Sequence, residues 1–308
     1  MTYIIVQFGF KKGYTIITLD KSTKELFSIF CKQNNFTDMP RAIEYFTVFG
    51  GIDIDIDTTK PLLELIEKHI LKEYNSLRNE VNYLTGGYSV DHAVLSGIAL
   101  GDRKTTNAFK RAYVSFEEGM KCVESLCEKG IIEIESSQHF MANKRGDSKI
   151  AKKLLFTNPF MRFWFAFVSP IYKGIKEGQF DEFYSKFTGR KADFSDFIFE
   201  ELALSYLEEV FEDDHIKQIG SYWDDKVQIT PIAKTTLGKV IVGYCKYADS
   251  KMKKSELNTL LQNCKNSDIV PDIVTLFVKN GYSSELKSLK SENLRLFTAK
   301  SFKGLVDL

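Results

Sequence analysis

The stretch IKQIGSYWDDKVQITPIAKTTLGKVIVGYCKY, residues 216–247, decides the fold of this chain. It contains three runs rich in β-branched and aromatic residues, a composition that is typical of strands. The runs are Ile216–Tyr222, Val227–Ala233 and Val240–Tyr247. Thr235–Gly238 predicts the turn between the last two runs. Helical patterns at Asp196–Val210 and Lys254–Cys264 flank the three expected strands.

The chain beyond this stretch alternates strand and helix. Strands are expected at Ile273–Val278 and Leu294–Thr298, with a helix at Ser283–Lys290 between them and a final helix after Thr298. An aromatic-rich helix is expected upstream, at Pro159–Val168. Helices that alternate with a meander of strands predict a mixed α/β fold, in which one sheet is covered on both faces.

Residues 86–157 predict a winged-helix-like domain. Three short helices are expected, at Ser89–Leu100, Thr106–Tyr113 and Ser115–Lys129. Two short strands, Ile131–Ile134 and Leu154–Phe156, enclose a hydrophilic loop and correspond to the wing. Three helices followed by a two-stranded wing are the winged-helix order.

Residues 1–85 predict a helical N-terminal segment with an extended start. Tyr3–Val6 and Tyr14–Leu19 indicate a hairpin, and helices are expected at Thr23–Gln33 and Pro40–Phe49. One longer helix is expected from Pro61 to Leu84, because apolar residues recur there every three or four positions. The chain therefore divides into residues 1–85, 86–157 and 158–308, the last being the α/β domain.

Composition and motifs exclude several classes of function. Lys and Arg number 42 against 41 Asp and Glu, so the chain lacks the strongly basic field of a nonspecific nucleic-acid coat. Neither a GxxxxGK[ST] P-loop nor a GxSxG elbow occurs in the sequence. The five cysteines show no CxxC spacing, which favours a reducing, cytoplasmic location. We expect no secretion signal, because the N-terminal apolar run Met1–Phe10 is short and ends at Lys11 and Lys12. We expect no membrane partner, because the most apolar later stretch, Phe160–Tyr172, is too short to span a bilayer.

Four motifs occur in an order that resembles a known domain. They are Phe163-Trp164-Phe165, Phe199-Glu200, Ile219-Gly220-Ser221-Tyr222-Trp223 and Val242-Gly243-Tyr244-Cys245-Lys246-Tyr247. From about Leu154 to Cys264 the chain resembles the domain of unknown function at the C-terminus of many archaeal and bacterial P-loop ATPases, where a winged helix precedes it. The order of helix, strand, hairpin and helix also resembles PD-(D/E)xK restriction-endonuclease-like nucleases. The ATPase motif of such proteins does not occur in this sequence.

The nuclease resemblance implies a divalent-metal site. In that fold two or three carboxylates hold Mg²⁺ or Mn²⁺, which lowers the pKa of a bound water, while a lysine orients or deprotonates that water. The resemblance makes Glu200 the metal ligand on the helix and Lys246 the catalytic lysine. The other two carboxylate positions are occupied by Thr230 and Tyr244, so two of the three metal carboxylates are replaced by neutral groups.

One carboxylate and one hydroxyl form a weak Mg²⁺ site, because this ion relies on charged ligands. Substitutes for the lost acids are available nearby in Asp224, Asp225 and Glu256. Without such a substitute, Glu200 and Lys246 are interpreted as a residual ion pair. The resemblance then implies a degenerate active site, and Mg²⁺ or Mn²⁺ is required only by an active enzyme.

The winged-helix-like region suggests contact with DNA, but its third helix is acidic. Glu117, Glu118, Glu124 and Glu128 on that helix would repel phosphates. The candidate nucleic-acid-binding residues lie in the wing and before the second helix, and they are Arg103, Lys104, Lys144, Arg145 and Lys149. The alternative is a packing or dimerisation module with a solvated basic loop.

Three hypotheses about function follow. The first is a nuclease-fold protein with a degenerate metal site that binds nucleic acid or serves in assembly or regulation. The second is an active, divalent-metal-dependent DNA endonuclease that uses migrated acidic residues. The third is a regulatory module for a separately encoded ATPase. DNA, a protein partner and a second copy of the chain are the partners that these hypotheses imply.

Overall fold

A computed structural model describes residues 15–16, 21–139 and 150–306 of the 308-residue chain. The chain divides into two compact units, which are described separately below. The first unit comprises residues 1–22, 45–133 and 154–188, and the second comprises residues 23–44, 134–153 and 189–308. Among the helices of the described residues, none has the length and apolar character needed to cross a membrane.

In the first unit, the extended run around Thr15 pairs with a partner that the sequence did not predict. Strand β1 (Thr15–Ile16) is antiparallel to β2 (Ile52–Asp53), which follows helix α2 (Met39–Phe49). The expected partner run, Tyr3–Val6, lies outside the described residues. Residue patterns indicate where a strand forms, but a pairing between distant segments depends on tertiary packing.

The single helix expected from Pro61 to Leu84 is wrong, because the structure breaks it into three pieces. Helix α3 (Leu62–Ile66) continues as one π-helical turn (Glu67–Leu71), and α4 (Tyr74–Thr85) begins after a break. The Glu67 carboxylate holds the break by accepting the Tyr184 hydroxyl at 2.5 Å and pairing with the Lys72 ammonium at 2.7 Å. The apolar stripe still faces the core on both sides of the break, so periodicity alone did not reveal it.

Helices α5 (Ser89–Ala99), α6 (Thr105–Ala112) and α7 (Phe116–Glu128) follow at the expected places. Strands β3 (Ile132–Glu135) and β4 (Lys153–Phe156) then form a two-stranded sheet. Gly97 permits the close approach of α5 and α6, since a Cβ at this position would lie 2.7 Å from the Ala108 carbonyl oxygen. The Arg111 guanidinium closes the end of α5 by donating to the carbonyls of Gly97 and Leu100.

An aromatic core fills the rest of the first unit. Helix α8 (Pro159–Phe163) leads into a π-helical turn (Trp164–Val168), a 3₁₀ turn (Ser169–Ile171) and α9 (Tyr172–Lys176). The Asn158 side chain caps α8 by accepting the Met161 N–H, and it also donates to the Gly51 carbonyl. The helix expected at Pro159–Val168 is confirmed, although its second half is π-helical.

Helix α10 (Asp181–Val210) is twice as long as the sequence pattern indicated. Its 30 residues begin well before the expected start at Asp196. Gly189 weakens the helical pattern in the first half of this helix, because glycine has a low helix propensity. Phe183 and Phe187 compensate, because both rings are buried against Phe163 in the first unit.

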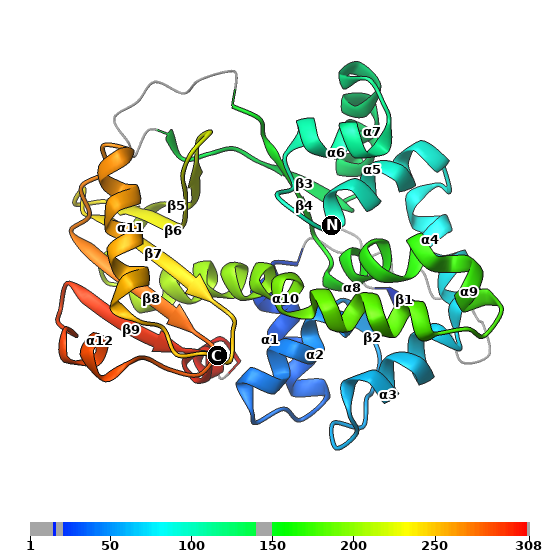
Figure 1. Cartoon of the computed structure of the whole chain (residues 1–308), viewed down its shortest axis with the longest axis horizontal. Helices are drawn as coiled ribbons and strands as arrows, with labels where there is room; N and C mark the ends of the chain where they lie inside the picture. Colours follow the sequence, from blue (N-terminus) through cyan, green and yellow to red (C-terminus); the bar gives the residue numbers. More distant parts are fainter. Residues whose placement is uncertain (1–14, 17–20, 140–149, 307–308) are drawn as a thin grey trace. The chain divides into compact units, whose positions relative to one another are not determined.

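The second unit is built on a five-stranded mixed sheet (Figure 1). The strands are β5 (Ile216–Trp223), β6 (Gln228–Thr235), β7 (Val240–Lys246), β8 (Ile273–Val278) and β9 (Leu294–Thr298), in that spatial order. The first three strands are antiparallel, and β7, β8 and β9 are parallel. The parallel connections contain α11 (Lys254–Asn266) and α12 (Ser284–Ser288). The mixed α/β fold class is therefore confirmed.

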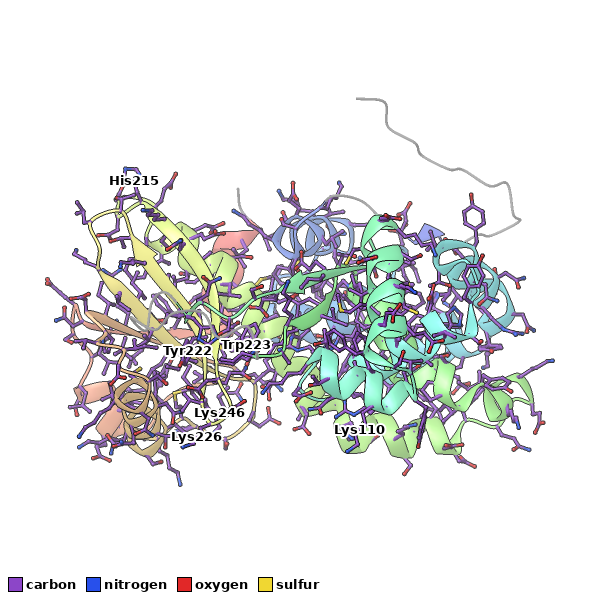
Figure 2. The ribbon with its side chains drawn as sticks, turned by 90° about the horizontal axis from the view of Figure 1, so that it is seen from above. Lys110, His215, Tyr222, Trp223, Lys226 and Lys246 are labelled. Atoms are coloured by element: carbon purple, nitrogen blue, oxygen red, sulfur yellow. The ribbon has the colours of Figure 1, made fainter. Side chains whose placement is uncertain are left out.

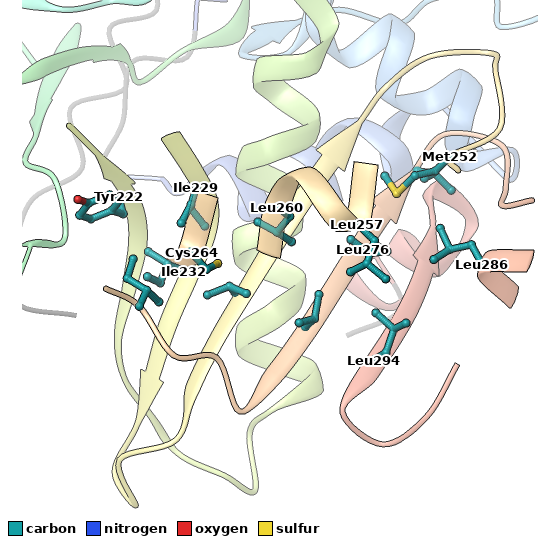
Figure 3. Close-up of a cluster of buried hydrophobic side chains, with 14 of the residues drawn as sticks. Tyr222, Ile229, Ile232, Met252, Leu257, Leu260, Cys264, Leu276, Leu286 and Leu294 are labelled. Carbon is teal, nitrogen blue, oxygen red and sulfur yellow. The ribbon is translucent and has the colours of Figure 1, made fainter. Parts of the chain in front are cut away.

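Successive side chains along each strand point to opposite faces of this sheet. Val242, Leu276 and Val278 point to α11, and their cluster also contains Leu257 and Leu260 of that helix (Figure 3). Tyr247, Phe277 and Phe297 point to the other face, where the rings of Phe199 and Tyr206 on α10 contact them. The unit is completed by α1 (Thr23–Gln33) and by a closing 3₁₀ helix (Ala299–Leu305) where a final helix was expected. The face to which each side chain points determines whether a residue of the candidate site lies beside α10 or beside α11.

Candidate functional site

Lys246, the expected catalytic lysine, lies at the C-terminal end of β7 and reaches toward α11. Its ammonium lies 2.5 Å from the Glu256 carboxylate. The same carboxylate accepts the backbone N–H of Lys253 at 2.7 Å and so caps α11. Burial opposes the charge of Glu256, but the hydrogen bonds from Lys246 and Lys253 hold its pKa below the ordinary range. Lys246 is thus engaged in a charge-assisted pair that also anchors a helix.

Glu200, the expected metal ligand, lies on α10 and therefore on the other face of the sheet. Its helix neighbour Asp196 accepts the Tyr247 backbone N–H at 2.8 Å, which ties α10 to the end of β7. Burial raises the pKa of Asp196 to about 6, against the effect of this hydrogen bond. Burial, with the negative charges of Glu200 and Asp196, also raises the pKa of the Cys245 thiol.

Thr230 and Tyr244, the two neutral positions, face each other across β6 and β7. Thr230 is buried, whereas Tyr244 is 38% exposed. Burial raises the pKa of the Tyr244 hydroxyl, and the carboxylates of Glu256 and Asp196 add to the effect. Tyr244 therefore stays a neutral phenol beside the Lys246 pair, and it supplies no charge for a cation.

The other acids proposed as metal ligands serve different purposes. The Asp224 carboxylate organises the turn between β5 and β6, because it accepts the Lys226 and Val227 backbone N–H groups and the Tyr222 hydroxyl, each at 2.8 Å. Asp225 is exposed in the same turn. In the described part of the chain, no group of three or more His, Cys, Asp or Glu side chains is placed to hold a metal ion. The donor set therefore does not fit Mg²⁺ or Mn²⁺.

The structure describes only two of the five expected nucleic-acid-binding residues. Arg103 and Lys104 are partly buried before α6, where Asp102 accepts the Lys104 backbone N–H at 3.3 Å. Lys144, Arg145 and Lys149 lie outside the described residues. Arg103 and Lys104 therefore contribute two positive charges, and the carboxylate of Asp102 lies beside them.

Two aromatic side chains at the junction of α6 and α7 are exposed, and sequence analysis did not single them out. Tyr113 ends α6 in the left-handed conformation, with a φ of 57°, and is 96% exposed. Phe116, at the start of α7, is 61% exposed and meets the buried Phe109 ring edge-on. The outward side of α7 continues with the exposed residues Glu117, Glu118, Lys121, Glu124 and Glu128. The sequence offered no signal for this exposure, because the left-handed conformation of Tyr113 is seen only in the structure.

Asp196 was also missed, although it had a signal in the sequence. It lies four positions before Glu200 on the same helix, and such residues share a helix face. Its raised pKa and its bond to the end of β7 make it the most perturbed carboxyl group of this region. Perturbed carboxyl groups gather at functional sites, although structural contacts also perturb them.

Comparison with known proteins gives one family match. No curated protein is significantly similar to the chain. A crystal structure of protein VC1899 from Vibrio cholerae aligns with a TM-score of 0.28 and 12% identity over 74% of this chain, and the alignment spans 53% of the Vibrio protein. The expected resemblance to a domain of unknown function is confirmed at this level: residues 164–258 match the family model DUF234, archaeal and bacterial proteins of unknown function.

Proposed function

We propose that this chain is a nuclease-like protein that binds nucleic acid without cleaving it. The observation that carries the proposal is the Lys246–Glu256 pair, 2.5 Å long, on the sheet face opposite Glu200. A nuclease of this kind needs its lysine and its carboxylates around one ion. Here the lysine neutralises a helix-capping acid instead.

The arrangement of elements supports the nuclease-like interpretation. Helix α10, the meander β5–β6–β7, helix α11 and the parallel strand β8 follow in the order of the PD-(D/E)xK core. Helices α5, α6 and α7 with strands β3 and β4 follow the order of a winged helix. We propose both assignments, because they account for the element order and for the motif positions together.

Binding through the wing is favoured by charge. Lys144, Arg145 and Lys149 stand against the single acid Asp147 in the segment 140–149. The outward side of α7 carries four glutamates and would repel a phosphate backbone. The wing is therefore one proposed contact, and Arg103 and Lys104 of the first unit are proposed as a separate one.

An electrophoretic shift with salt titration tests this proposal. Replacing Lys144, Arg145 and Lys149 with alanine is expected to weaken binding to duplex DNA and to flatten its salt dependence by about 0.9 in logarithmic slope for each lost phosphate contact. The matched control replaces three exposed lysines elsewhere (Lys287, Lys290 and Lys300) and should leave the slope unchanged. Equal affinity and slope for both triple variants would show that the wing is not the binding surface.

A plasmid-nicking assay tests the absence of cleavage. The wild-type protein is expected to leave supercoiled plasmid intact with either Mg²⁺ or Mn²⁺, because its donor set lacks the required negative charge. Lys246→Met supplies the control, since contaminating nuclease activity would not depend on this residue. Metal-dependent nicking by the wild type that disappears in Lys246→Met would support the rival hypothesis, an active endonuclease with migrated acids.

Protein assembly is a second candidate function, and the surface of α6 and α7 favours it. Exposed tyrosine and phenylalanine side chains such as Tyr113 and Phe116 are typical anchors of protein interfaces. The acidic rim along α7 would complement a basic partner surface. A regulatory module for a separately encoded ATPase would use the same surface. A wild-type protein that fails to shift DNA at low salt would favour this candidate over nucleic-acid binding.

A further inference from the structure

The outward surface of α7 carries an acidic stripe beside exposed apolar side chains. Helices α6, where Lys110 is labelled, and α7 lie side by side in the first unit (Figure 2). Residues that are three or four positions apart share one side of a helix. Phe116 and the partly buried Met120 have this spacing and form an apolar edge. Four exposed charged residues have it as well and form the acidic stripe: Glu117, Lys121, Glu124 and Glu128.

Packing against α6 holds this surface in place. A Cβ at Gly119 would lie 2.5 Å from the Phe109 ring, so the two helices are in close contact there. The Phe109 ring also meets the Phe116 ring edge-on, with centroids 5.6 Å apart. The Ser115 hydroxyl caps α7 by accepting the Glu118 backbone N–H at 3.2 Å. The surface is therefore ordered before any partner arrives, which lowers the entropy that binding would cost.

Glu124 and Glu128 are placed where they destabilise the helix that carries them. They are four positions apart, where like charges repel, and they lie toward the negative end of the helix dipole of α7. Within the part of the chain that the structure describes, neither has an ion-pair partner. The adjacent Lys129 is engaged elsewhere, because its ammonium donates to the Thr85 carbonyl at 2.8 Å. Cations supplied by a partner would relieve this repulsion.

Tyr113 is also placed at a cost to stability. It ends α6 with a φ of 57°, a conformation that is strained for a residue with a Cβ and unstrained for glycine. Its ring is almost wholly exposed, so packing does not compensate for the strain. Phe116, three positions later, is the second largely exposed ring. Exposed aromatic rings of this kind are typical anchors of protein interfaces.

The charge of the acidic stripe argues against three kinds of partner. Nucleic acid and anionic lipid surfaces would both be repelled by it. A second copy of the chain, bound symmetrically, would bring the same glutamates face to face. A basic segment of another protein fits, because its lysines or arginines would neutralise Glu124 and Glu128. An apolar residue of the same segment could then cover the exposed rings.

We propose that the outward surface of α6 and α7 docks a basic amphipathic segment of a partner protein. Tyr113 and Phe116 contact its apolar residues, and its cations pair with Glu124 and Glu128. The inference rests on the second candidate function, protein assembly, and adds the chemistry of the partner. Glu117 and Glu128 are separated by about 16 Å along the helix axis, so a helical segment of about 15 residues would cover the stripe.

Thermal unfolding shows whether these residues serve folding or binding. Tyr113→Gly removes backbone strain, and the double variant Glu124→Gln with Glu128→Gln removes like-charge repulsion. Each is expected to raise the unfolding midpoint by about 1–3 °C, although each should weaken binding. A lower midpoint in either variant would assign the residues to folding and would overturn the proposal.

A displayed library of random peptides about 15 residues long supplies the binding probe. Selection uses immobilised wild-type protein, with counter-selection on a variant that carries Phe116→Ser, Glu124→Gln and Glu128→Gln. We expect enriched peptides to combine several lysines or arginines with an aromatic or aliphatic residue. The best of them should bind Phe116→Ser, and separately the double glutamine variant, about tenfold more weakly than the wild type. Salt should weaken binding to the wild type and to Phe116→Ser more than to the glutamine variant.

Matched controls remove similar groups elsewhere on the chain. Tyr83 is an exposed aromatic residue of the first unit, so Tyr83→Ser is the control for Phe116→Ser. Glu212 and Asp213 are exposed neighbours in the second unit, so Glu212→Gln with Asp213→Asn is the control for lost negative charge. Both controls should bind the selected peptide as the wild type does. Equal losses in the controls and in the α7 variants would contradict a specific surface.

The remaining outcomes separate this inference from the proposed functions. Failure to enrich peptides that distinguish the wild type from the counter-selection variant overturns it, and so does enrichment of neutral or acidic peptides. Self-association of the wild type in sedimentation, abolished by Phe116→Ser, would keep assembly but make a second copy the occupant, which also overturns it. A protein that binds the selected peptide but fails to shift DNA upholds it and contradicts nucleic-acid binding.

Discussion

Replacing Asp196 with asparagine is expected to stabilise the protein by about 1–2 kcal/mol at pH 7.5 and to leave its stability unchanged near pH 4. The cause is the burial of this carboxyl group between α10 and the end of β7, which raises its pKa from 3.8 to about 6. A shift of this size corresponds to about 3 kcal/mol, and partial exposure of the group reduces the effect. Asparagine still offers an oxygen to the Tyr247 N–H, so the link between α10 and β7 survives.

The direction of the pH dependence follows from the raised pKa. Below the unfolded-state pKa, Asp196 is protonated in both states and the native fold bears no penalty. As the pH rises through 4 to 6, the unfolded chain ionises first, and above pH 6 the folded chain carries a partly buried charge. Urea denaturation at pH 4 and pH 7.5 measures the difference. Asp193→Asn, one helical turn earlier and exposed, is the matched control and should have little effect. An Asp196→Asn protein that is less stable than the wild type at pH 7.5 would contradict this account.

Gly97→Ala is expected to destabilise the protein by about 2–3 kcal/mol, although alanine is the better helix former. The new methyl group would lie 2.7 Å from the Ala108 carbonyl oxygen, which is backbone and cannot rotate away. Helices α5 and α6 would have to separate, and the bonds from Arg111 to the end of α5 would weaken.

Gly189→Ala is the matched control for this substitution. Gly189 lies in the interior of α10, is exposed, and has open space where its Cβ would be. Alanine there should stabilise the protein by about 0.5–1 kcal/mol, because the unfolded chain loses freedom while the helix gains propensity. Thermal or urea unfolding of the two variants gives the comparison. Destabilisation of similar size in both would show that helix propensity and local strain, rather than the contact with α6, determine the effect.

The sequence predicted most elements of the second unit correctly, because the residues that favour each element lie within that element or next to it. Strand β8 is found at Ile273–Val278 as expected, and β9 at Leu294–Thr298. Alternating apolar residues and turn residues encode such strands within a few positions. The long form of α10 was not predictable in this way. Its first turns are held by Phe183 and Phe187, whose partners lie elsewhere in the chain.

The candidate site also combines features that the sequence predicted with features that depend on packing. The sequence indicated that Tyr244 and Lys246 share one face of a strand, and the motif resemblance selected Glu200 and Thr230. Which charged group would approach Lys246 depended on the path of α11 after β7. That path brings Glu256 to the ammonium and leaves Glu200 on the opposite face. An ion pair between residues on different elements depends on how those elements pack, and the local sequence pattern does not reveal that packing.

Within this protein, the sequence by itself determined the α/β class, the strand positions of the C-terminal region, and the uncharged character of positions Thr230 and Tyr244. These properties depend on periodicity and on residue identity at each position. Only the tertiary structure decided that β1 pairs with β2, that the helix after Pro61 breaks between Leu71 and Tyr74, and that Lys246 pairs with Glu256. Each of these depends on contacts between distant residues, whose free energy is gained only when the chain has folded.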